Sequence, residues 1–178
     1  MNHESIVIIS FGQLRQEMLG IISADVMLKL PIPVKTRTEY LDLNEFFDPG
    51  RRQYNGTSLL KMIDDKFASA PSKTIGLFTV DLFIPILTFI FGQAFLNGRS
   101  GIASNFRLSN ERYGVKRDDT ILQERFCKEI IHELGHMFGL IHCRDPYCVM
   151  RSSTYVEDID QKGGEFCSSC RSSLILNL

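Results

Sequence analysis

Three of the four histidines in this 178-residue chain, His132, His136 and His142, lie within one eleven-residue window. On a helix, residues four apart lie on one face about 6 Å from each other, so His132 and His136 can reach the same metal ion. Gly139 can end that helix and turn the chain sharply, since glycine adopts a positive φ without steric cost, and the turn would bring His142 back to the same point. Three neutral imidazoles leave a fourth coordination position open. The spacing therefore predicts a catalytic zinc site.

Glu133 follows the first histidine and points about 100° around the helix, near enough to contact a metal-bound water but badly placed to be a ligand. We interpret Glu133 as a general base. The pattern HExxHxxGxxH over residues 132–142 resembles the signature of the metzincin metallopeptidases. This resemblance implies that zinc activates water for attack on a peptide bond, with Glu133 moving the proton. It also implies a structural turn at Met150, which on the residues alone is equally an ordinary core methionine, and makes Tyr155 a candidate hydrogen-bond donor to the intermediate.

Four cysteines form two pairs near the end of the chain, Cys143 with Cys148 and Cys167 with Cys170. Two such pairs separated by an 18-residue loop are typical of a tetrahedral, closed zinc site with a structural role. A redox-active CxxC or disulfides are the alternatives. Cys127 has no partner in this pattern, and we interpret it as a small buried apolar residue.

The histidine motif followed directly by Cys143, then Cys148-Val149-Met150 and a later CxxC, resembles the archaemetzincin family. The resemblance implies an α/β (α+β) metzincin-like fold. Its parts are a twisted mixed sheet with an antiparallel edge strand, backing helices, an active-site helix and a small zinc-tied C-terminal subdomain. We expect one catalytic domain over residues 1–178, divided into subdomains at 1–139 and 140–178, with two zinc ions. A peptide or protein substrate would bind along the edge strand, which is either 87–96 or 101–108.

Apolar periodicity predicts the elements that must position these residues. Short β-branched or apolar runs predict strands at 5–10, 31–37, 73–82, 87–96 and 101–108, the last two joined by a hairpin at Asn97-Gly98. Helical spacing predicts helices at 14–28, 58–67 and 121–138, with a surface loop at 44–55. Thr120 and Gln123 have capping-box spacing at the start of the last helix.

Charge and composition bear on the classes of partner. The chain has 20 Lys and Arg against 21 Asp and Glu, without a long run of one sign, so a zinc ribbon that binds nucleic acid is disfavoured. The apolar stretch 83–96 is shorter than the roughly 20 residues of a membrane span, and residues 1–5 do not resemble a secretory signal. We expect a cytoplasmic monomer.

The leading hypothesis is thus a zinc metallopeptidase, without a choice between endo- and aminopeptidase. The alternative is a catalytically weak or inactive zinc-binding interaction protein on the same scaffold. Glu133 favours the enzyme, because a purely structural zinc has no use for a carboxylate at that position.

Overall fold

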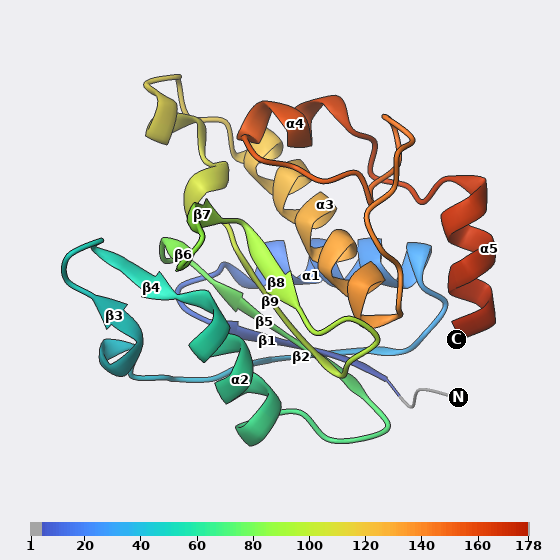
Figure 1. The fold of residues 1–178 in the computed structure, drawn as a ribbon, viewed down its shortest axis with the longest axis horizontal. Coiled ribbons are helices and arrows are strands. Elements are labelled where there is room, and N and C mark those ends of the chain that lie inside the picture. The colour runs from blue at the N-terminus through green and yellow to red at the C-terminus, as the bar shows by residue number, and fades with distance from the viewer. Residues whose placement is uncertain (1–4, 178) are drawn as a thin grey trace.

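A five-stranded sheet forms the centre of the molecule (Figure 1). The structure, a computed structural model, describes residues 5–177. The strand order is β2-β1-β5-β9-β8, with bounds β1 (Ile6–Phe11), β2 (Val34–Thr38), β5 (Lys73–Phe78), β8 (Gly92–Ala94) and β9 (Ser100–Ser104). The first four strands in this order are parallel, whereas β8 runs antiparallel to β9 at the sheet edge. The predicted mixed sheet with an antiparallel edge strand is confirmed.

Helices cover both faces of this sheet, because alternate side chains of a strand point to opposite sides. Ile6 and Ile8 pack into a core with α1 (Gln16–Lys29) and α3 (Asp119–Met137). Ile9 and Phe11 pack into a second core with α2 (Gly56–Lys66). Strands β5 and β9 are buried along their whole lengths, because both faces of the sheet are covered.

A smaller four-stranded sheet lies beside the first, in the order β3-β4-β6-β7. Its strands are β3 (Phe47–Asp48), β4 (Gln53–Asn55), β6 (Leu82–Ile84) and β7 (Leu87–Ile90). The prediction of a loop over 44–55 was therefore wrong, since a 3₁₀ turn (Asn44–Phe46) and two strands occupy it. These strands are too short to show a clear alternation in the sequence, and pairing with β6 holds them.

Two predicted strands also differ from the structure. Residues 87–96 divide between β7 of the small sheet and β8 of the large one, because the chain passes from one sheet to the other at Phe91. Residues 101–108 end as a 3₁₀ turn (Phe106–Leu108), and β9 lies inside the sheet, so β8 is the edge strand.

Helix α3 has its N-terminal cap at Asp118, whose carboxylate accepts hydrogen bonds from the backbone N–H groups of Thr120 and Ile121. The predicted capping box at Thr120 was wrong by two residues, because the helix begins at Asp119 and Asp118 is its N-cap. At the other end Gly139 has a φ of 87°, as the turn required.

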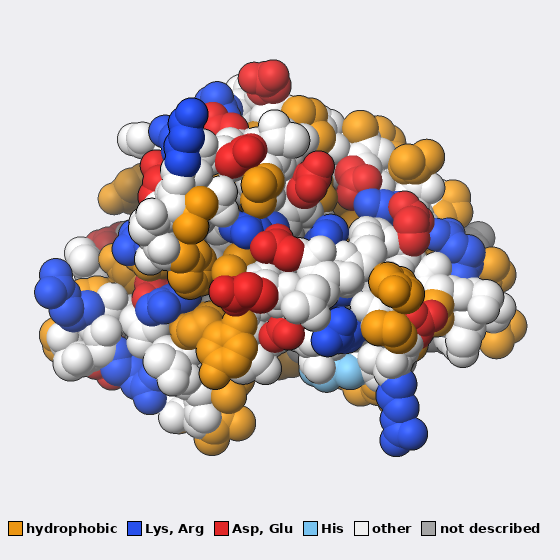
Figure 2. All heavy atoms as spheres, turned by 90° about the horizontal axis from the view of Figure 1, so that it is seen from above, with side chains coloured by type: hydrophobic (Ala, Val, Ile, Leu, Met, Phe, Trp, Pro, Cys, Tyr) orange, Lys and Arg blue, Asp and Glu red, His pale blue; other side chains and the backbone are white. Residues whose placement is uncertain are grey.

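The rest of the chain after Gly139 packs over α3 and contains α4 (Val156–Gln161) and α5 (Ser168–Asn177). A 3₁₀ turn (Asn110–Tyr113) precedes α3. Within residues 5–177, no helix has the length and apolar character to cross a bilayer. Figure 2 shows acidic and basic side chains mixed on the upper face, with histidine atoms reaching the surface there.

Candidate metal centre and active site

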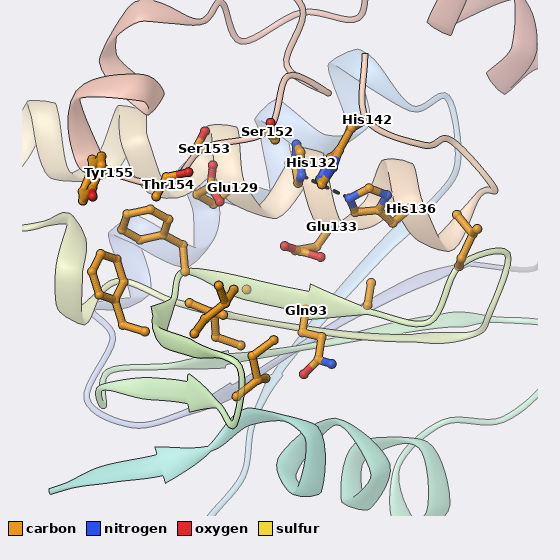
Figure 3. Close-up of a pocket in the computed structure, with 18 of the residues that line it drawn as sticks. Gln93, Glu129, His132, Glu133, His136, His142, Ser152, Ser153, Thr154 and Tyr155 are labelled. Atoms are coloured by element: carbon orange, nitrogen blue, oxygen red, sulfur yellow. Dashed lines mark hydrogen bonds between the residues drawn. The ribbon is translucent and has the colours of Figure 1, made fainter. Parts of the chain in front are cut away.

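The three histidines converge on one point (Figure 3). His132 and His136 lie on α3, and the chain reverses at Gly139 so that His142 joins them. One ring nitrogen of each histidine lies within 4.8 Å of the others, and the ring centroids are 4.7 to 5.3 Å apart. The structure thus brings together all three predicted ligands.

Second partners fix the orientation of two of these imidazoles. Nδ1 of His132 donates a hydrogen bond to the carbonyl of Val149 at 2.8 Å, and Nδ1 of His136 donates to the carbonyl of Leu140 at 2.7 Å. Each Nε2 therefore carries a lone pair, and the two Nε2 atoms face each other at 3.1 Å. Two acceptors so close need a cation between them, and their separation fits two nitrogen ligands at about 2.0 to 2.1 Å from one zinc ion.

Desolvation favours the neutral form of these imidazoles, most strongly at buried His132. Desolvation lowers the pKa of His132 well below its ordinary value, with the charge of Lys162 as the next cause. Desolvation also lowers the pKa values of His136 and His142. A neutral imidazole is the form that binds a metal, so the donor set fits zinc.

Glu133 lies in the same cavity as the histidines, with its side chain buried. Burial raises the pKa of its carboxyl well above the ordinary value, and the charge of Glu129 adds to this effect. The edge strand contacts it directly, because a Cβ at Gly92 would lie only 2.6 Å from Oε1 of Glu133. Gly92 was not predicted as a site residue, and no local signal in the sequence marks it.

The cavity has a volume of about 580 Å³. Its walls come from the end of β6, from β7 and β8, from α3, and from residues 152–155 of the C-terminal part. Since both sheets and the active-site helix contribute, the cavity exists only in the folded chain.

Met150 and Tyr155 differ in their relation to the histidines. Met150 is fully buried with its sulfur against Gly135, where a Cβ would collide with it, so a small residue on α3 makes room for the thioether. Tyr155 lines the cavity but lies at the end away from His136 and His142 in Figure 3. Its role as a donor to the intermediate stays a prediction.

The four predicted cysteines form a second cluster, with their sulfur atoms within 4.8 Å of one another. The sulfurs of Cys143 and Cys167 are 3.7 Å apart, beyond the roughly 2.05 Å of a disulfide and suited to two thiolate ligands of one tetrahedral ion. Backbone N–H groups of Asp145 and Cys167 donate to the sulfurs of Cys143 and Cys148. Such donors stabilise thiolate charge, so the cluster has the chemistry of a closed zinc site.

Cys127 is buried, as predicted. Desolvation is the main cause that raises the pKa of its thiol to about 12. It is therefore a small apolar residue in the core shared by α1 and α3.

Two buried lysines tie other parts of the chain to α3. The Lys162 ammonium lies 2.9 Å from Oε1 of Glu129 and donates to the carbonyl of Arg151, next to Met150. The Lys73 ammonium donates to the carbonyls of Gly98 at 2.7 Å and Met137 at 2.8 Å, so it joins the β8–β9 turn to the end of α3. Neither lysine was predicted, since their partners are distant in sequence.

The β8–β9 turn makes one further contact with the active-site helix, as the backbone N–H of Asn97 donates to the carbonyl of His136 at 2.8 Å. On the other side, the backbone N–H of Cys143 donates to the carbonyl of Met150 at 2.9 Å. The edge strand and the cysteine cluster are thus both held against the histidine site.

Comparison with known proteins gives one consistent result. The sequence model of peptidase family M54 matches residues 10–175. An archaemetzincin of Thermococcus kodakarensis is 40% identical over 133 residues, which cover 74% of this chain and 72% of the relative. An archaemetzincin of Sulfolobus acidocaldarius is 37% identical over 153 residues, 85% of each chain.

Solved structures agree with this result. The crystal structure of archaemetzincin from Methanopyrus kandleri superposes with a TM-score of 0.85 at 32% identity, covering 98% of this chain and 95% of the other. A zinc-dependent peptidase from Methanocorpusculum labreanum has a TM-score of 0.82 at 29% identity, covering 96% and 100%.

Proposed function

This chain belongs to peptidase family M54, the archaemetzincins, and is a zinc metallopeptidase; we propose that His132, His136 and His142 hold its catalytic zinc and that Glu133 is the general base. The observation that carries the proposal is the convergence of three imidazole nitrogens within 4.8 Å, with the Glu133 carboxylate lining the same cavity. Three protein ligands leave the open position that hydrolysis needs.

Zinc in such a site polarises the substrate carbonyl and lowers the pKa of water to about 7. Glu133 then accepts the proton of the attacking water and returns it to the leaving amine. Its burial supports this role, because a carboxylate removed from bulk water holds a proton more firmly. His132 and His136 keep their orientation through the carbonyls of Val149 and Leu140.

We propose that the peptide binds as an added strand along β8. One side of β8 pairs with β9, and its other side is the free edge of the five-stranded sheet. Gly92, Gln93 and Ala94 all line the cavity that holds Glu133, so backbone pairing at this edge would bring a peptide bond beside the carboxylate.

We further propose that Cys143, Cys148, Cys167 and Cys170 bind a second, structural zinc, giving two ions per chain. This ion would hold a C-terminal subdomain, residues 140–178, against the first subdomain, residues 1–139. His142 is followed directly by Cys143, so a structural ion there would also position the third catalytic ligand. Four reduced thiols suit the cytoplasm, where we expect the protein to act as a monomer. Cell fractionation and sedimentation would test these two expectations.

The test of the catalytic proposal is digestion of a peptide library by the zinc-loaded protein and by its Glu133→Ala variant. We expect the variant to keep its zinc, measured by metal analysis, and to lose cleavage by at least about 10³-fold. Glu124→Ala, an exposed carboxylate on the same helix, is the matched control and should keep both. Undiminished cleavage by a zinc-loaded Glu133→Ala variant would refute the role of Glu133. No cleavage by the wild type would instead favour a zinc-binding interaction protein.

A further inference from the structure

A second cavity, with a volume of about 420 Å³, lies outside the active site and is lined by four arginines. Arg51 and Arg52 come from the loop between β3 and β4, Arg107 from the 3₁₀ turn after β9, and Arg112 from the 3₁₀ turn before α3. These segments lie at the left of Figure 1. The other lining residues are Asp81, Phe106 and Tyr113. Four guanidinium groups thus accompany one carboxylate, although the charges of the whole chain nearly cancel.

The single carboxylate is already bound by one of the four arginines. Nε and Nη2 of Arg107 donate to the two oxygens of Asp81 at 2.7 and 2.6 Å, and Asp81 is buried. Within residues 5–177, no acidic side chain lies within ion-pair distance of Arg51, Arg52 or Arg112. The cavity therefore contains three positive charges without an ion-pair partner.

The loop between β3 and β4 fixes two of these charges side by side. The carboxylate of Asp48 accepts a hydrogen bond from the backbone N–H of Arg51 at 3.0 Å, and its carbonyl accepts one from the backbone N–H of Arg52 at 2.7 Å. Arg52 has a φ of 57°, a left-handed conformation that residues with a Cβ seldom adopt. This turn places the side chains of both arginines on the same cavity, although they are consecutive in the chain.

The guanidinium groups are held in place but keep free donors. Arg51 donates to the carbonyls of Pro85 at 3.3 Å and Leu87 at 3.0 Å, which uses two of its five N–H groups. The guanidinium of Arg112 lies 3.5 Å from the centroid of the Phe106 ring, and no acceptor within residues 5–177 binds its N–H groups. Stacking occupies the face of a guanidinium and leaves its edge, where the N–H groups lie, open to a ligand.

Like charges that share a cavity repel each other, so an anion is the ligand that relieves this repulsion. We propose that the arginine cavity binds a phosphate group. Phosphate carries about two negative charges and several acceptor oxygens, and guanidinium groups bind it through paired N–H···O hydrogen bonds. A carboxylate, with one charge and two oxygens, would leave most of the unpaired arginines without a partner. The volume has room for an organic part, so the phosphate is either free or carried by a small molecule.

This cavity is distinct from the histidine site, because the two cavities share no lining residue. Strand β7 lies between them. Arg51 bonds to the carbonyl of Leu87 on one side of that strand, and the guanidinium of Arg107 lies 4.4 Å from the ring centroid of Phe89. Leu87 and Phe89 themselves line the active-site cavity. The phosphate site is therefore a neighbour of the peptidase site, and its existence does not depend on the proposed function.

Titration calorimetry at pH 8 and low ionic strength tests the proposal on the zinc-loaded protein without excess zinc. Inorganic phosphate should bind at least about 10-fold more tightly than acetate, because it carries the second charge and further acceptor oxygens. Adenosine monophosphate in the same assay distinguishes the two sources of the group. Tighter binding than that of inorganic phosphate indicates a small organic phosphate, and weaker binding indicates free phosphate. Equal binding of acetate and phosphate would overturn the proposal.

Two variants separate this site from phosphate bound directly to the zinc. Arg52→Ala and Arg112→Ala should each weaken phosphate binding by about 10-fold, and both should fold, since their side chains are exposed. Arg107 is left intact because its removal would leave buried Asp81 without its partner. Arg37→Ala is the matched control, since Arg37 is an exposed arginine on β2 that lines neither cavity. Wild-type affinity for phosphate in both Arg52→Ala and Arg112→Ala would refute the site.

Discussion

Gly92 of the edge strand offers the sharpest test of how the fold positions Glu133, the proposed general base. A Cβ at this position would lie 2.6 Å from Oε1 of Glu133, 2.8 Å from its Cγ, and 2.8 Å from the carbonyl oxygen of Ile102. Ordinary van der Waals contacts begin at about 3.4 Å, so in Gly92→Ala the carboxylate must withdraw by about 0.8 Å. The neighbouring strand must also yield by about 0.6 Å, and backbone yields less easily than a side chain.

Displacement of a catalytic group by about 1 Å can cost on the order of 10²-fold in rate, so we expect kcat/KM of Gly92→Ala to fall by about 30- to 100-fold. Overpacking should also lower the free energy of unfolding by about 1 to 3 kcal/mol. Zinc should remain bound, because the three histidines are not among the atoms that the new methyl group approaches most closely. Peptide hydrolysis, urea unfolding and metal analysis on one preparation measure the three effects.

Gly20→Ala is the control, because it is the same substitution at a position where the added methyl group does not contact Glu133. Gly20 lies on α1, and a Cβ there would meet no atom within 4 Å beyond its own stretch of helix, so alanine should raise the free energy of unfolding by about 0.5 to 1 kcal/mol. Its kcat/KM should stay at the wild-type value. If zinc-loaded Gly92→Ala hydrolyses peptides as fast as Gly20→Ala, the contact between the edge strand and Glu133 does not set the position of the base.

Three other predictions address the supports of the site. Cys143→Ser should lower the zinc content from two ions to one or fewer and should lower the melting temperature. Two retained zinc ions with an unchanged melting temperature would contradict the coupling between the cysteine cluster and the histidine site. Lys73→Met should lower the free energy of unfolding by about 2 kcal/mol, because two backbone carbonyls lose their buried hydrogen-bond donor. The control Lys61→Met, at an exposed lysine, should change it by less than about 0.5 kcal/mol. Equal midpoints of urea unfolding for the two variants would refute this prediction. Cys127 should resist iodoacetamide at pH 8.5 in the native protein and react after unfolding, because a pKa of about 12 leaves on the order of 10³-fold less thiolate than in an ordinary cysteine. Rapid alkylation of Cys127 in the native protein, measured by mass spectrometry, would contradict its burial.

The sequence predicted most directly those features that depend on short separations along the chain. His132 and His136 share a face because a helix repeats every 3.6 residues, and Gly139 allows the reversal that returns His142. The short β-branched run at 5–10 likewise predicted a buried strand, and β1 packs into a core on each face. Covalent geometry fixes each of these relations, so spacing alone was sufficient.

Other sequence predictions failed where two local solutions competed. Thr120 and Asp118 are both residue types that cap helices, and α3 begins at Asp119 with Asp118 as its cap. Residues 87–96 carry enough apolar side chains for one long strand, but the presence of two sheets divides them at Phe91. Local propensity does not contain this information, since it depends on which strands are available for pairing.

The tertiary structure alone decided what surrounds the predicted zinc ligands. Gly92 lies against Glu133, and Lys162 lies against Glu129, although about 40 and about 30 residues separate the members of these pairs. Such contacts arise from the packing of β8 and the C-terminal part on α3, and packing joins residues without any fixed spacing in the sequence. The sequence therefore determined the chemistry of the site through its predicted ligands, whereas the fold determined the shape and burial of the cavity around them.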